Sequence, residues 1–147
     1  GPITGLSFRQ SSRGFRSALA VSSIDCTLSV FSGEKMTKEI SLITGSFVGC
    51  EWRPSPPSST SISPVLAALG SDNKVSLYDI AQDDERSFQL PAMGCCSAFS
   101  GDGSLLCVDA LMEVIISSIV HNFNKYDYYF TLIDILLFFM ISMHLRG

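Results

Sequence analysis

Short apolar stretches separated by polar turn residues fill the chain up to residue 110. Two of them, ALAV (18–21) and VLAAL (65–69), are entirely apolar, which is typical of a strand buried on both faces. Each is followed by a turn that contains Asp and then by a stretch of period two, TLSVF (27–31) or KVSLY (74–78). Because successive side chains of a strand point to opposite faces, the pattern predicts strands joined as hairpins.

Polar and Pro-rich segments mark the ends of these strands. RPSPPSSTSISP (53–64) predicts a surface loop over 54–63, because Pro and Ser interrupt any regular element. A fourth strand of each unit is expected within KEISLITG (38–45) and SFQLPAM (87–93), and the second strand of each unit is expected to be the most buried. The other predicted strands are 3–9, 17–23, 27–32, 47–52, 65–70, 74–79 and 96–100.

The strand pattern repeats within the chain. LAVSSIDCTLSVFS (19–32) aligns without gaps with LAALGSDNKVSLYD (66–79), 47 positions later. A second pattern of small or apolar positions ends in an aromatic residue, Phe8, Trp52 or Phe99, at intervals of 44 and 47 residues. A β-sandwich also has short alternating strands, but the gapless repeat argues against it. The chain is therefore expected to be all-β, with repeated four-stranded antiparallel sheets that bury their faces against one another.

CSAFSGDGSLLCVDA (96–110) resembles the first half of the repeat of the WD40-repeat family of β-propellers, with Gly101 where Pro is usual. The two 14-residue stretches are similar to the second half of that repeat, and Tyr78-Asp79 stands at the place of its Trp-Asp dipeptide. A complete Trp-Asp dipeptide and the family's Gly-His signature are both absent from the sequence. The resemblance covers about residues 3–110 and implies incomplete β-propeller blades, two and a half in number.

The same resemblance implies a function in protein assembly. WD40 propellers present loops on a rigid ring, so the implied function is a non-catalytic scaffold that binds other proteins within a larger adaptor or complex. The implied location is intracellular, in the cytoplasm or the nucleus. The net charge of −4 and the lack of a basic run give no reason to expect a nucleic-acid partner.

No catalytic motif, cofactor-binding motif or metal-ligand spacing is present in the repeated part of the sequence. The two histidines, His121 and His144, both follow residue 110, so a histidine-dependent triad or a zinc cluster is not expected in the repeats. We therefore expect no enzyme activity, no cofactor and no metal site. The five cysteines form no CxxC pair and are expected to be reduced and buried: 26, 50, 95, 96 and 107.

Four polar residues recur at turn positions. Asp25 and the pair Asp72-Asn73 lie in the two predicted hairpin turns, and Asp102 lies in the SGDGS stretch. Asp and Asn side chains bind the neighbouring backbone and tolerate the left-handed conformation that tight turns need. We interpret these residues as structural turn residues.

Two insertions contain candidates for regulation and binding. Ser55 and Ser63 each precede Pro and are candidate phosphorylation sites, although the simpler interpretation is a solvated loop without regulation. Four arginines at or after the end of the first strand of a unit could gather on one rim, where they would meet an acidic partner or only solvent: Arg9, Arg13, Arg16 and Arg53.

The repeat pattern stops abruptly after Ala110. Residues 111–147 contain no Ala or Pro, and their one Gly is the last residue. We divide the chain into a propeller fragment, 1–110, and an off-pattern hydrophobic tail, 111–147, which is expected to be helical because no Pro or internal Gly interrupts it. The 16-residue stretch 128–143 is short of the roughly 20 apolar residues of a membrane span. It also contains Asp134, so a membrane anchor is not favoured.

Two origins of the tail stay open. The tail is rich in Ile, Phe, Tyr, Met and Asn, which AT-rich codons encode, whereas Ala and Pro are not encoded by such codons. The tail is therefore either translated non-coding sequence, which would give a truncated product with no independent function, or the genuine tail of an isoform, which would tether the protein to a membrane. Sequencing the transcript across the codons for Asp109 and Leu111 separates these hypotheses.

Overall fold

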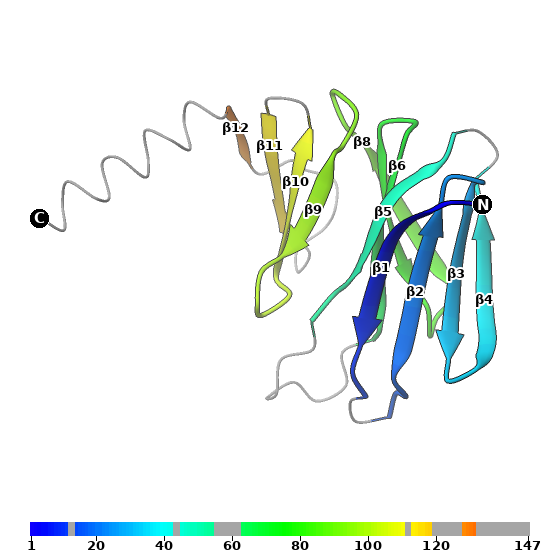
Figure 1. Ribbon diagram of the computed structural model, residues 1–147. Helices are drawn as coiled ribbons and strands as arrows, with labels where there is room; N and C mark the ends of the chain where they lie inside the picture. The colour runs from blue at the N-terminus through cyan, green and yellow to red at the C-terminus, as the bar shows by residue number, and fades with distance from the viewer. Residues whose placement is uncertain (12–13, 43–44, 55–62, 111–112, 119–127, 132–147) are drawn as a thin grey trace, which may run out of the picture.

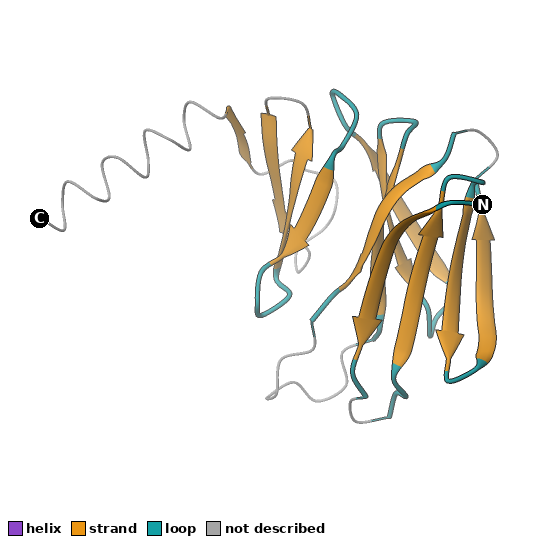
Figure 2. Ribbon diagram, in the orientation of Figure 1, coloured by secondary structure: helices purple, strands orange, loops and turns teal. Residues whose placement is uncertain are grey.

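The computed structural model describes residues 1–11, 14–42, 45–54, 63–110, 113–118 and 128–131. In this part of the chain every regular element is a strand (Figures 1 and 2). The first sheet contains β1 (Ile3–Arg9), β2 (Ala18–Ser23), β3 (Thr27–Ser32) and β4 (Lys35–Ser41). The second contains β5 (Phe47–Trp52), β6 (Val65–Gly70), β7 (Lys74–Asp79) and β8 (Asp84–Gln89). The third contains β9 (Cys96–Phe99), β10 (Leu105–Ala110), β11 (Glu113–Ser118) and β12 (Tyr128–Thr131).

Each sheet is a meander in which strands consecutive in the chain pair in antiparallel fashion. The first strands of the sheets, β1, β5 and β9, lie next to one another along one side of the stack (Figure 1). Two hydrogen bonds join β1 to β5: the Thr4 hydroxyl donates to the Phe47 carbonyl at 2.8 Å, and the Trp52 N–H donates to the Ser7 hydroxyl at 3.0 Å. These bonds hold β1 beside β5, one near the starts and one near the ends of the two strands.

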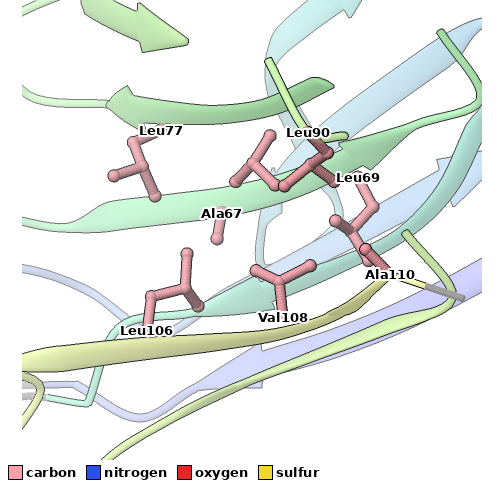
Figure 3. Close-up of a cluster of buried hydrophobic side chains, with 8 residues drawn as sticks. Ala67, Leu69, Leu77, Leu90, Leu106, Val108 and Ala110 are labelled. Carbon is pink, nitrogen blue, oxygen red and sulfur yellow. The ribbon is translucent and has the colours of Figure 1, made fainter. Parts of the chain in front are cut away.

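The second sheet is enclosed on both faces. Leu66 and Ala68 of β6 and Tyr78 of β7 pack toward the first sheet, in a cluster with Ala20, Leu28, Val30, Phe47 and Trp52. Ala67 and Leu69 alternate with them on β6 and pack toward the third sheet (Figure 3), in a cluster with Val75, Leu77, Leu90, Leu106, Val108 and Ala110. A strand covered on both faces needs apolar side chains at every position, which explains the uninterrupted VLAAL run.

The strands predicted from the pattern are confirmed, five of them with the predicted bounds. The other two differ by one residue, at the start of β2 and at the end of β9. The second strand is also the most buried of its sheet, with three of six residues buried in β2 against two in β3, and five in β6 against four in β7. The predicted loop 54–63 is non-strand at both of its described ends, and 55–62 lie outside the described residues.

The fourth strands were placed too late in the sequence. β4 and β8 begin three residues earlier than the predicted segments, 38–45 and 87–93. Each strand also ends four residues earlier than the end of its predicted segment. Both strands are mostly exposed, so their bounds leave no apolar alternation in the sequence. Their start depends instead on the turn before them: Gly33, at φ 63°, reverses the chain within two residues and lets β4 pair with β3 at once.

The prediction of a helical tail is wrong for the two segments of the tail that the structure describes. Residues 113–118 and 128–131 are strands of the third sheet, and Glu113 pairs with Ala110. The edge of β10 that faces away from β9 offers a row of backbone N–H and C=O groups. The segment EVIISS (113–118) contains β-branched residues, which suit pairing with that edge. The rest of the tail lies outside the described residues. Backbone pairing thus crosses the proposed division at residue 110. The division into a propeller fragment and an off-pattern tail stays a prediction.

No helix long and apolar enough to cross a membrane occurs among the described residues.

Candidate interaction surface

Strand ends gather on two rims of the stack. We call the one that carries the β2–β3 and β6–β7 connections the turn rim. We call the opposite one, where β1 and β5 end, the arginine rim. Each of these two connections is three residues long, 24–26 and 71–73. The last residue of each is left-handed, Cys26 at φ 71° and Asn73 at φ 61°. The left-handed conformation expected for the Asp-containing turns is therefore adopted by the residue that follows each Asp, not by the Asp itself.

Asp25 and Asp72 brace these connections in different ways. The Asp25 carboxylate accepts the N–H and hydroxyl of Thr27, at 3.3 and 2.6 Å, and lies 2.8 Å from the N-terminal amine. The hydrogen bond from that amine, followed by the one from Thr27, holds the pKa of Asp25 well below its usual range. Asp72 Oδ2 lies 3.5 Å from Lys74 Nζ, whereas its buried Oδ1 has no hydrogen-bond partner among the described residues.

Asp102 braces the β9–β10 turn on the arginine rim. Its Oδ1 accepts the Ser100 hydroxyl at 2.6 Å and the Ser104 N–H at 3.0 Å. These bonds, that from Ser100 foremost, lower the pKa of Asp102 to about 2. Gly103 completes the turn in the left-handed conformation, at φ 69°.

The arginine rim contains a hollow between the ends of β1 and β5, which we call the rim pocket. Its volume is about 310 Å³. Arg9 and Arg53 both line it, whereas Arg16 does not and only accepts a hydrogen bond at its carbonyl from Arg9 Nη1, at 3.4 Å. Arg13 lies outside the described residues. The full lining is Phe8, Arg9, Gln10, Ser11, Trp52, Arg53 and Pro54.

Arg9 forms a buried wall of the rim pocket. Only 6% of it is exposed, and its guanidinium carbon lies 5.3 Å from the ring centre of Phe15 and 5.9 Å from that of Trp52. Aromatic rings attract a cation toward their faces, so both contacts hold the guanidinium in place. Burial lowers the pKa of Arg9, but an arginine stays charged at neutral pH.

Arg53 is held by a turn of the third sheet. Its Nε donates to the Gly103 carbonyl at 2.7 Å. A Cβ on Gly103 would lie 2.8 Å from the Pro54 carbonyl oxygen and 3.1 Å from Arg53 Cγ and Nε, so only glycine allows this approach. Burial lowers the pKa of Arg53, and the charge of Asp102 partly opposes that effect.

A second hollow of about 170 Å³ is also lined by Arg53 and has mixed charge. Its acidic residues are already engaged: Asp84 Oδ2 lies 3.3 Å from Arg86 Nε, and Asp79 Oδ1 accepts the N–H groups of Ala81 and Gln82, both at 3.0 Å. The rim pocket, in contrast, has no carboxylate among the described residues that line it.

The two candidate phosphorylation sites differ in what the structure describes. Ser55 lies outside the described residues. Ser63 is half-buried, and its hydroxyl donates to Asp79 Oδ1. A phosphate on Ser63 would therefore face a carboxylate, and its role as a modification site stays a prediction.

The cysteines are all free, but the expectation that they are buried is wrong. Cys95 and Cys96 are exposed, and Cys26, Cys50 and Cys107 are half-buried. Cys26 belongs to a turn, and Cys96 and Cys107 belong to strands of the third sheet, which packs against another described sheet on one face only. Within the described residues no group of His, Cys, Asp and Glu is arranged to hold a metal ion, and His121 and His144 lie outside them.

Comparison with known proteins defines the fold. No family model and no curated protein sequence matches the chain. Among solved structures, the β-propeller domain of Cps50 (Swd1) from Myceliophteria thermophila superposes with a TM-score of 0.67 at 17% sequence identity, over 88% of this chain and 42% of that one. The three sheets are β-propeller blades. The chain spans less than half the length of that propeller domain.

The first blade has an open face that is covered in the second. Trp52 and Leu66 are buried against the first blade, at 6% and 0% exposure. Their equivalents in the repeat are Phe8, which is 65% exposed, and Leu19, which is half-buried. Leu6 and Ile3 of β1 are exposed as well, at 62% and 60%. In the described structure, the first blade thus displays a blade-packing face without a neighbouring blade.

Proposed function

We propose that the chain is part of a WD40-type propeller that acts as a non-catalytic scaffold for protein–protein interactions. The observation that supports it is the combination of a rigid two-sided blade stack with side chains held at its strand ends. The second blade is enclosed on both faces, so the ends of β5 and β7 are fixed in space. Surfaces pre-organised in this way bind partners at a low entropic cost.

The places of two motifs in the blades support the proposed WD40 membership. Tyr78-Asp79, at the position of the Trp-Asp dipeptide, ends β7, the third strand of its blade. SGDGS (100–104) forms the turn between the first and second strands of the third blade. Both are the places that the family's repeat assigns to these motifs.

Three acidic turn residues support a non-catalytic function. Asp25, Asp79 and Asp102 accept hydrogen bonds from groups within their own turns, which orders the backbone there. A carboxylate occupied in this way is a poor general base. We place the protein in the cytoplasm or the nucleus, as the family resemblance implies.

Crosslinking in cells tests the scaffold function. The full chain, Arg53→Ala and the control Lys35→Ala, a change at an exposed position of β4, would be expressed at matched levels and crosslinked, and their partners identified by mass spectrometry. We expect a reproducible partner set that Lys35→Ala retains and Arg53→Ala reduces. Recovery of chaperones alone by all three proteins would contradict a scaffold function.

A further inference from the structure

The rim pocket combines hydrogen-bond donors with apolar walls. Phe8, Pro54 and the Trp52 ring are apolar, and two guanidinium groups stand among them. A volume of about 310 Å³ is at the lower end of the range for small ligand sites. It accommodates one or two side chains of a partner rather than a whole cofactor.

One donor of a residue that lines the pocket lacks an acceptor. Trp52 is 6% exposed, and its indole Nε1 is buried with no hydrogen-bond partner among the described residues. A buried N–H left without an acceptor is unfavourable, and native structures satisfy nearly all such groups. Its position beneath the pocket marks this wall as polar under an apolar surface.

Arg53 has the geometry of an anchor. Its Nε is bound to the Gly103 carbonyl, so an incoming group meets the Nη side of the guanidinium. The planar fork of a guanidinium pairs well with a planar carboxylate. The buried charge of Arg9, on the same pocket, raises the local potential for an anion.

We propose that the rim pocket is a subsite for a carboxylate of a partner protein, an Asp or Glu side chain flanked by an apolar residue. Arg53 donates to the carboxylate, Arg9 supplies a second positive charge, and Phe8 and Pro54 contact the apolar neighbour. This inference rests on the proposed scaffold function and names the chemistry of one contact.

Trp52 gives a direct readout, because it is the single tryptophan of the chain and lines the pocket. The full chain would be titrated with the capped peptide acetyl-Leu-Glu-Leu-amide, and with its Gln counterpart, while tryptophan emission is followed. We expect a saturable change with the Glu peptide, affinity at least tenfold lower for the Gln peptide, and weakening of Glu-peptide binding by salt.

Variants separate a binding role of Arg53 from a structural one. Arg53→Met should lower affinity for the Glu peptide at least tenfold, and Arg53→Lys should fall between it and the wild type. Lys74→Met, which removes a cation at the turn rim, should bind as the wild type does. Circular dichroism and thermal melts would show whether each variant is folded. If Arg53→Met does not fold, the affinity of Arg53→Lys tests the binding role of Arg53.

Three results would overturn the proposal: equal affinity for the Glu and Gln peptides, wild-type binding by Arg53→Met, or a phosphoserine peptide that binds tenfold more tightly than the Glu peptide. None of them would refute the scaffold function, because crosslinked partners retained by Arg53→Ala could bind elsewhere on the blades.

Discussion

Leu66 and Leu19 are equivalent residues of β6 and β2, but only Leu66 is enclosed between two blades. Leu66 is 0% exposed and pairs across the sheet with Trp52 and Tyr78, whereas the half-buried Leu19 pairs with Phe8 and Phe31 on the open face. The substitutions Leu66→Ala and Leu19→Ala remove the same atoms from the two environments. Their difference measures what blade packing contributes.

The magnitude follows from the burial of each side chain. Leu66→Ala removes three buried carbons, which costs about 2.4 kcal/mol at about 0.8 kcal/mol per methylene. A residual cavity of roughly 50 Å³ adds about 1.2 kcal/mol. The expected loss is therefore about 3.5 kcal/mol. Leu19→Ala removes a half-buried side chain and leaves no closed cavity, so it should cost about 1 kcal/mol.

Urea unfolding, followed by Trp52 emission and by circular dichroism, measures both losses of free energy. Coincident transitions by the two probes would justify a two-state treatment. If Leu19→Ala costs as much as Leu66→Ala, the first blade's face is covered in solution and our description of it as open is wrong. If Leu66→Ala costs under about 1 kcal/mol, the blades do not pack as the structure shows.

Three further predictions concern turns. Gly103→Ala should lower the free energy of unfolding by about 1–3 kcal/mol, because its φ is 69° and a Cβ would press on Arg53. In the same melts Gly101→Ala, where nothing lies within 4 Å of the added Cβ, should be nearly neutral, and equal losses would contradict this. Asn73→Val should destabilise the chain by about 1–2 kcal/mol in urea, since φ at this residue is 61°, whereas Asn73→Gly should be tolerated. A larger loss for Asn73→Gly than for Asn73→Val would show that residue 73 is not the left-handed turn residue. The pKa of Asp102 is lowered to about 2 in the folded chain, so its stabilising effect is complete above the unfolded pKa, near 4, and is lost as the pH falls toward 2. Urea midpoints of wild type and Asp102→Asn should therefore differ at pH 6 and converge near pH 2, and a difference independent of pH would refute this.

The sequence by itself determined the strands whose side chains are sorted between core and solvent. β3, β6 and β7 were predicted with their observed bounds, because burial imposes a period of two or an unbroken apolar run on the residues themselves. The repeat and its turns followed in the same way, since Asp, Asn and Gly act on the backbone within a few residues.

Tertiary structure alone decided the features that depend on distant partners. β4 and β8 are mostly exposed, so the pairing edge of the strand before them places them rather than their own sequence. The segment 113–118 forms β11 because it pairs with an edge of β10. This pairing outweighs the helix that the lack of Pro and Gly in the segment predicted. The rim pocket joins Arg9 to Arg53, 44 positions apart, only because β1 and β5 pack side by side. Whether Leu19 or Leu66 is covered depends in turn on which blade has a neighbour, and the two residues look alike in the sequence.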